Sequence, residues 1–201
     1  MVTTIIMKKA LFFTLLAIAS YATFAQDKPE GLFINSKAPE FKAKDQNGTE
    51  VTLKDLRKKG PIVLVFYRGN WCPYCNRELK RFQDSLQLIT DKGAQVVAIT
   101  PEAGEGIAKT VEKTGATFPI LFDSEVKIAR SYQVAYDVDD KTATRYKSFG
   151  NDLLLINQQK GKAVLPVPAV YIINKEGSVI YRFFESDYRR RPSVKDILAQ
   201  L

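Results

Sequence analysis

The chain has 201 residues, of which 45% are hydrophobic and 26% charged, as is typical of a soluble globular domain with a sizeable core. It contains no histidine, which excludes Ser-His-Asp and Cys-His catalysis as well as histidine metal ligands. Only two cysteines are present, so a disulfide-rich scaffold is also excluded. The net charge of +8 comes from scattered lysines and arginines, which indicates a solvated surface and no nucleic-acid partner.

The sequence over 1–25 predicts a signal peptide. Two lysines precede an apolar run over 10–19, and a small-residue cleavage site follows. We expect cleavage after Ala25, with Ser20-Tyr21-Ala22 as a second candidate site. An uncleaved anchor is the alternative, but the run is shorter than the roughly 20 apolar residues that a membrane span needs. We therefore expect 26–201 to form one exported domain, in a bacterial periplasm, without stable membrane insertion.

A β-hairpin is predicted at the start of the mature chain. The segments 41–44 and 50–53 favour extended structure, and the Asn47-Gly48 dipeptide between them favours a type I′ turn. The two segments are therefore expected to pair in antiparallel fashion.

Strands and helices then alternate. Continuous β-branched and aromatic runs predict buried strands, and apolar residues three or four positions apart predict helices. In chain order we expect a strand over 62–67, a helix carrying Leu79, Phe82, Leu86 and Ile89 and ending near Gly93, a strand over 95–100, a helix around Ile107 and Val111, a strand over 118–122, a helix capped by Ser124, an extended segment over 134–138, a hairpin of 170–173 with 179–184, and a last helix starting at Ser193. The polar stretch 139–163 is predicted to be an insertion that could hold one helix. This order predicts an α/β sheet covered on both faces.

Both cysteines lie in the segment Trp71-Cys72-Pro73-Tyr74-Cys75, between a predicted buried strand and an amphipathic helix. Unpaired N–H groups and the helix dipole stabilise a thiolate at a helix N-terminus, and Pro73 fits the first helical turn. We expect Cys72 to be exposed and acidic, and Cys75 to lie one turn further in and more buried. This arrangement suits attack by Cys72 on a substrate disulfide and release by Cys75 through a mixed disulfide.

Three other uses of the cysteine pair compete with this one. A static disulfide in a non-catalytic binding module is one, although a four-residue loop constrains the unfolded chain little. A zinc site needs more ligands than the chain offers, and haem attachment needs a histidine where Asn76 stands. We therefore expect no metal and no cofactor other than a redox-active Cys72–Cys75 disulfide.

The segment 66–79 resembles the peroxiredoxin-like branch of the thioredoxin superfamily, which is the alkyl hydroperoxide reductase/thiol-specific antioxidant family. Weaker similarity extends over 34–200. The resemblance implies a thioredoxin fold, a central mixed sheet flanked by helices, with an N-terminal hairpin extension and an insertion before the strand that follows Pro168. It also implies a cis Val167–Pro168 bond beside the cysteines, which would offer the Val167 backbone to a docked substrate.

The sequence departs from peroxiredoxins where they activate peroxide. Their Pro-x-x-x-Thr-x-x-Cys motif is kept in neither register; with Cys75 as the peroxidatic residue, for example, Cys72 takes the Thr position and Arg68 the Pro position. Pro168 stands where peroxiredoxins usually place an arginine. The buried aspartate of thioredoxin is also missing, which leaves Arg68 and Glu78 as possible charged helpers.

The expected function is thiol–disulfide exchange in an antioxidant or redox role, with Trp71 and Tyr74 flanking the substrate groove. A thiol peroxidase acting on hydrogen peroxide or alkyl hydroperoxides is the alternative. The partners would be a protein dithiol or disulfide, or a peroxide, together with an external thiol donor. Tyr188 and the following Arg189–Arg191 are interpreted as a solvated turn that could also serve in docking.

Overall fold

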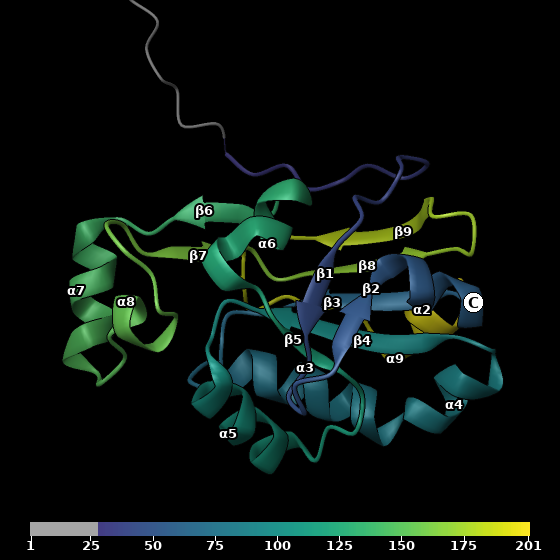
Figure 1. The fold of residues 1–201 in the computed structure, drawn as a ribbon, viewed down its shortest axis with the longest axis horizontal. Coiled ribbons are helices and arrows are strands. Elements are labelled where there is room, and N and C mark those ends of the chain that lie inside the picture. Colours follow the sequence, from purple (N-terminus) through teal and green to yellow (C-terminus); the bar gives the residue numbers. More distant parts are fainter. Residues whose placement is uncertain (1–27) are drawn as a thin grey trace, which may run out of the picture.

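The computed structural model describes residues 28–201, so the predicted signal peptide lies outside the described residues. A five-stranded mixed sheet forms the centre of the molecule (Figure 1). Its spatial order is β5 (Ile120–Phe122), β4 (Gln95–Thr100), β3 (Ile62–Phe66), β8 (Ala169–Ile173) and β9 (Val179–Phe184). The strands β3, β4 and β5 run parallel, whereas β8 is antiparallel to both β3 and β9. The predicted strands and closing hairpin are therefore confirmed.

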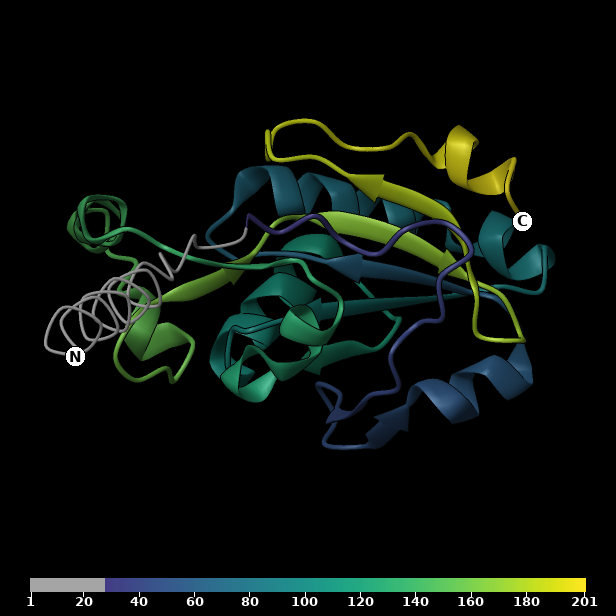
Figure 2. The same ribbon diagram turned by 90° about the horizontal axis from the view of Figure 1, so that it is seen from above.

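Helices cover both faces of this sheet (Figure 2). One face packs against α3 (Pro73–Asp84), α4 (Leu86–Asp91), α5 (Gly104–Thr114) and α9 (Val194–Leu198). The other face packs against α2 (Leu53–Lys59) and α6 (Lys127–Ser131). Strand β3 is buried along its whole length and sends alternate side chains into the two cores, as strand geometry requires. The strand that leads into the cysteine segment is thus held from both sides.

The predicted N-terminal hairpin is present, but its turn is of another type. Strand β1 (Lys42–Lys44) pairs antiparallel with β2 (Glu50–Thr52). Gly48 has φ +78°, whereas Asn47 is not in the positive-φ region that a type I′ turn requires of both central residues. The Asp45 carboxylate accepts hydrogen bonds from the N–H groups of Asn47 and Thr49, and the Gly48 N–H bonds back to the Asp45 carbonyl. The aspartate thus shapes a four-residue turn that ends on glycine.

Two helices differ from their predicted form. The single helix expected from Leu79 to Ile89 breaks at Ser85, whose φ and ψ of −109° and 10° end α3, and α4 begins at the next residue. The helix expected to start at Ser124 begins instead as the short 3₁₀ turn η1 (Ser124–Val126), followed by α6. The buried Asp123 carboxylate caps α6 by accepting from the backbone N–H groups of Ile128 and Ala129.

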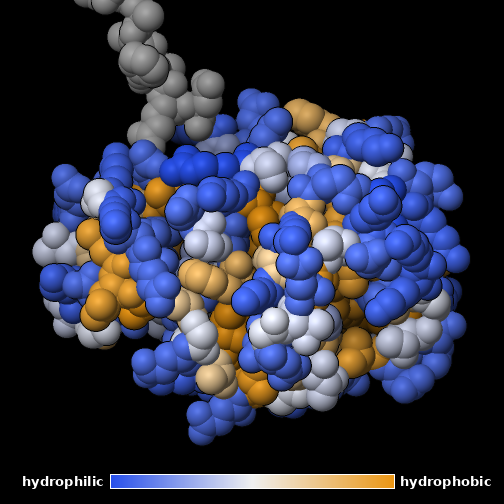
Figure 3. Space-filling view, viewed as in Figure 1, coloured by the Kyte–Doolittle hydropathy of each residue, from blue (hydrophilic) through white to orange (hydrophobic). Residues whose placement is uncertain are grey.

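The predicted insertion forms a lobe beside the sheet, seen at the left of Figure 1. It holds two helices, α7 (Asp140–Ser148) and α8 (Leu153–Ile156), where at most one was expected. A two-stranded antiparallel ribbon of β6 (Ala135–Asp137) and β7 (Val164–Pro166) joins the lobe to the domain. In Figure 3, apolar side chains show among the polar ones on this lobe. No helix within residues 28–201 is long and apolar enough to cross a membrane.

Candidate active site

The loop between β3 and α3 has a tightly fixed backbone. Gly69 adopts φ +151°, and a Cβ atom there would lie 2.6 Å from Nε1 of Trp71 and 3.0 Å from Oε1 of Glu102. The buried Glu102 carboxylate accepts hydrogen bonds of 2.7 Å from both the backbone N–H and the side-chain amide of Asn70. Burial raises the pKa of Glu102, while its bonds to Asn70 act in the opposite direction. Glycine and carboxylate together position the residues directly before α3.

The two cysteines form a disulfide at the start of α3, with their Cα atoms 5.3 Å apart. Cys72 is the N-cap residue, and its Sγ accepts a hydrogen bond from the Cys75 N–H at 3.3 Å. Pro73 occupies the first helical turn, where its missing N–H leaves no bond unmade. The predicted placement of the pair at a helix N-terminus is therefore confirmed.

The predicted exposure of Cys72 is wrong. Both cysteines are completely buried, with 0% of their surface exposed. The physical reason is that other side chains pack against the two sulfurs. The position of Cys72 at the start of a helix does not reveal these contacts. Arg68 of the preceding loop contacts Cys72 Sγ, and Arg191 of the segment after β9 contacts Cys75 Sγ.

Arg68 lies directly against Cys72. Its Nη2 donates to Cys72 Sγ at 3.2 Å and its Nη1 donates to the hydroxyl of Tyr146 at 3.1 Å. The guanidinium lies over the Tyr188 ring at 4.0 Å and near the Trp71 ring at 5.1 Å, both cation–π distances. Only 4% of Arg68 is exposed, so this predicted helper is a buried cation in contact with sulfur.

Glu78 is also buried, and it pairs with an arginine from the far end of the chain. Its Oε2 lies 2.8 Å from Nε of Arg191, and the side chains of the two residues are 2% and 5% exposed. Burial raises the pKa of Glu78 to about 7, although Arg191 acts to lower it. The same burial lowers the pKa of Arg191. Nη2 of Arg191 lies 3.7 Å from Cys75 Sγ, so the ion pair reaches the second sulfur.

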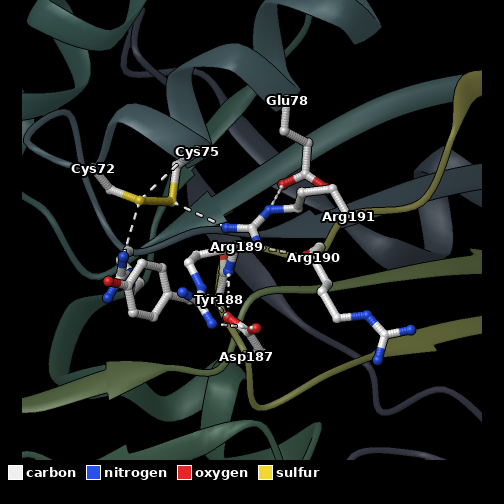
Figure 4. Close-up of polar contacts among 9 residues, drawn as sticks. Cys72, Cys75, Glu78, Asp187, Tyr188, Arg189, Arg190 and Arg191 are labelled. Atoms are coloured by element: carbon white, nitrogen blue, oxygen red, sulfur yellow. Dashed lines mark hydrogen bonds and ion pairs between the residues drawn. A yellow bond between two sulfur atoms is a disulfide. The ribbon is translucent and has the colours of Figure 1, made fainter.

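The segment 185–191, after β9, covers the disulfide (Figure 4). Its Tyr188 packs edge-on against Tyr74, with ring centroids 5.7 Å apart. The first two of the three consecutive arginines form exposed ion pairs, with Asp187 and Glu185 respectively. The interpretation of all three as a solvated turn is therefore wrong for Arg191, because a buried carboxylate draws it inward.

The predicted cis Val167–Pro168 bond is wrong, since no cis peptide occurs within residues 28–201. The trans form is the intrinsically preferred one, and here the Val167 N–H donates to the Val134 carbonyl at 2.8 Å, which ties this segment to the chain before β6. Val167 and Pro168 line a cavity of about 900 Å³, and Tyr188 borders the same cavity. They therefore share this cavity with Tyr188, whose ring lies 4.0 Å from the guanidinium that contacts Cys72.

A sequence model of the AhpC/TSA family matches residues 34–182, a range that contains both cysteines and the central sheet. The chain belongs to the AhpC/TSA family. This AhpC/TSA protein is an oxidoreductase of the peroxiredoxin and thiol–disulfide oxidoreductase branch of the thioredoxin superfamily.

Its AhpC/TSA relatives include both activities. The chain is 29% identical over 133 residues to the thiol-disulfide oxidoreductase ResA of Geobacillus kaustophilus, covering 65% of this chain and 75% of that protein. It is also 29% identical over 167 residues to the peroxiredoxin Bcp of Bacillus subtilis, covering 83% and 90%. The solved peroxidoxin BcpB of Mycobacterium tuberculosis superimposes with a TM-score of 0.64 at 21% identity, covering 83% of this chain and 94% of that one. This likeness shows a thioredoxin-like fold.

Sequence reasoning missed Tyr146 and Glu102 and misjudged Arg191. Tyr146 lies in the insertion, where no pattern connects it with the cysteines. Glu102 stands two residues after the end of β4. Because β3 and β4 are parallel, their carboxyl ends lie at the same edge of the sheet, which brings Glu102 next to Asn70. That signal could have found Glu102, whereas nothing local could have found the other two.

Proposed function

We propose that this AhpC/TSA oxidoreductase is an exported thiol–disulfide oxidoreductase in which Cys72 is the nucleophile and Cys75 the resolving residue. The observation that carries the proposal is the position of Cys72 Sγ, at the N-cap of α3 and 3.2 Å from the Arg68 guanidinium. Helix N-terminal N–H groups and a neighbouring arginine both favour a thiolate over a thiol. Cys75 lies within the first turn of α3, where it forms the disulfide with Cys72.

The exchange proceeds in two steps when the reduced protein meets a substrate disulfide. The Cys72 thiolate attacks one substrate sulfur, so that an S–S bond forms to Cys72 and the substrate's other sulfur leaves as a thiolate. Cys75 then loses its proton and attacks Cys72 Sγ, which closes the Cys72–Cys75 disulfide and expels the remaining substrate thiolate. Two electrons pass to the substrate, and an external dithiol restores the reduced pair by the reverse chemistry.

Substrate access requires a movement, because both sulfurs are fully buried. Tyr188, at 40% exposure, is an accessible part of the cover, and it borders the cavity lined by Val167 and Pro168. We propose that a cysteine-bearing chain enters along this cavity and displaces Tyr188. Trp71 and Tyr74 would then flank the reacting sulfurs.

A thiol peroxidase is the second candidate. The contact between Arg68 and Cys72 favours it, since a guanidinium beside a thiolate could also polarise a bound peroxide. In that reaction the Cys72 thiolate would take one peroxide oxygen to become a sulfenic acid, releasing water or an alcohol, and Cys75 would condense with it to the disulfide and a second water.

Cysteine substitutions test the exchange proposal. Wild type should accelerate the reduction of insulin disulfides by dithiothreitol, and Cys72→Ser should return the rate to the uncatalysed value. Cys75→Ser should form a mixed disulfide with the substrate that is visible by mass spectrometry. Full activity of Cys72→Ser would overturn the proposal. Peroxide consumption by the reduced wild type far above that of a free thiol would support the second candidate instead.

Export is tested separately. We expect the mature protein, expressed from the full chain in a Gram-negative host, to be released with the periplasmic fraction and to begin at Gln26. A membrane-bound product that retains 1–25 would support the anchored alternative.

A further inference from the structure

Among the contacts between the insertion and the cysteine site, that of Tyr146 reaches furthest toward the sulfurs. Helix α7 has no buried residue and belongs to the lobe beside the sheet (Figure 1). Yet Tyr146 on this helix accepts a hydrogen bond from Nη1 of Arg68 at 3.1 Å, and its ring centroid lies 4.8 Å from that of Trp71. A residue 78 positions away in sequence thus contacts the loop that precedes Cys72.

Among the residues that the structure describes, none supplies Arg68 with a counter-charge. It is 96% buried, and within residues 28–201 it forms no ion pair with a carboxylate. Its Nε is buried without a hydrogen-bond partner among the described residues. A buried cation without an anion is costly. The group placed to supply that anion is Cys72, whose Sγ already faces Nη2 and becomes a thiolate on reduction.

We propose that Tyr146 is a positioning residue that holds the Arg68 guanidinium against Cys72 Sγ, so that the insertion 139–163 sets the reactivity of the nucleophilic sulfur. The proposal rests on the proposed function of Cys72. The hydroxyl of Tyr146 fixes Nη1, and because the guanidinium is planar, Nη2 is then directed at the sulfur. Trp71 and Tyr188 restrict the remaining rotation by lying close to the guanidinium.

This arrangement favours a reduced protein in which Cys72 is a thiolate. An external dithiol gives two electrons to the Cys72–Cys75 disulfide and becomes a disulfide itself. Cys75 takes one of its two protons, the other goes to solvent, and Cys72 remains a thiolate paired with Arg68. Stabilising this reduced form makes the pair more oxidising, as thiolate stabilisation generally does.

Other charged and titratable groups near the disulfide also influence how the reactivity of Cys72 depends on pH. Arg191 lies near Cys75, with Glu78 behind it. The half-buried Tyr136 also lies in the field of Arg68, which acts to lower the pKa of Tyr136 against the raising effect of burial. A matched comparison that changes only the Tyr146 hydroxyl keeps all of these groups constant.

The test uses the Cys75→Ser protein, in which Cys72 is the only thiol of the chain. Its alkylation by iodoacetamide is followed from pH 4 to pH 9. Adding Tyr146→Phe should raise the apparent pKa of Cys72 and slow alkylation at pH 6 by about three- to tenfold, because one charge-assisted contact is weakened. The control is Tyr181→Phe, whose hydroxyl lies toward Asp196, and it should leave the profile unchanged. Arg68→Met sets the upper limit of the effect.

The same substitutions in the two-cysteine protein are equilibrated with a dithiol buffer. Tyr146→Phe should make the disulfide three- to tenfold harder to reduce, which is about 15–30 mV. Phenylalanine keeps the ring that packs on Trp71, so thermal unfolding should change little.

An alkylation profile and an equilibrium constant that stay at wild-type values in Tyr146→Phe would overturn the proposal. So would an Arg68→Met protein that matches wild type in both measurements. Neither result would contradict the proposed function, which is contradicted only if Cys72→Ser still catalyses exchange.

Discussion

The two sulfurs of the disulfide have different electrostatic surroundings. Cys72 faces Arg68, a buried cation stacked on aromatic rings and without a carboxylate partner within residues 28–201. Cys75 faces Arg191, whose charge is balanced by Glu78 at 2.8 Å. Both arginines are nearly inaccessible to solvent, so neither contact is weakened by exposure.

This difference indicates which sulfur carries negative charge after reduction. The net positive charge near Cys72 stabilises a thiolate there, whereas the neutral pair near Cys75 offers little net charge. A thiolate at Cys72 and a thiol at Cys75 match the proposed roles of nucleophile and resolving residue. The comparison also suggests that Cys75 responds to pH through Glu78, because protonation of that carboxyl leaves Arg191 unbalanced.

The largest expected effect comes from removing the charge of Glu78. Since burial raises its pKa in the folded protein to about 7, the folded state holds this proton more tightly than the unfolded state. Its stabilising contribution is complete below about pH 4.5 and is lost as pH rises through about 7. Relative to Glu78→Gln, wild type should therefore lose about 3 kcal/mol of unfolding free energy between pH 4 and pH 8.

Urea denaturation of the two oxidised proteins at several pH values measures this difference. Asp123 and Glu102 also have raised pKa values, but they are present in both proteins and their effects cancel. A difference between the two proteins that does not vary with pH would mean that Glu78 stays ionised and that Arg191 is balanced throughout.

Replacing each of the two arginines by methionine, one at a time, tests directly whether the two sulfurs differ in their electrostatic surroundings. In single-cysteine proteins, Arg68→Met should slow alkylation of Cys72 at pH 6 by about tenfold or more, since an unbalanced buried charge is lost. Arg191→Met should change the alkylation of Cys75 at pH 8 by less than about threefold, because Glu78 is ionised at that pH and an already balanced charge is removed. Iodoacetamide kinetics measure both rates. Equal effects at the two sulfurs would refute the proposed asymmetry.

Much of the fold could be predicted from local pattern. The apolar runs of β3, β4 and β8 are long enough to identify buried strands, and the Cys-x-x-Cys segment identifies the start of α3. Local pattern failed where a single polar contact decides the geometry. Asp45 determines the turn of the first hairpin, and Asp123 determines where α6 begins.

The environment of the site could not be predicted, because it is assembled from distant segments. Arg68 was identified from its place beside the cysteines, but the residues that orient it lie in the insertion and after β9. Burial of Cys72 follows from those same contacts, so the expected exposure failed for the same reason. Arg191 looked like one of three equivalent arginines, and only its pairing with Glu78 distinguishes it.

The smallest expected effect concerns Tyr188, whose ring lies over Arg68 beside Cys72. Tyr188→Ala removes the ring over Arg68 and opens the path to Cys72, so reduction by dithiothreitol should become several-fold faster. Trp71, the single tryptophan, neighbours the disulfide and should report the reaction by its fluorescence in stopped flow. The matched control is Phe33→Ala, which removes an exposed aromatic ring over a different arginine, Arg182. If both variants are reduced at the wild-type rate, Tyr188 does not limit access, and the asymmetry between the sulfurs is one of charge alone.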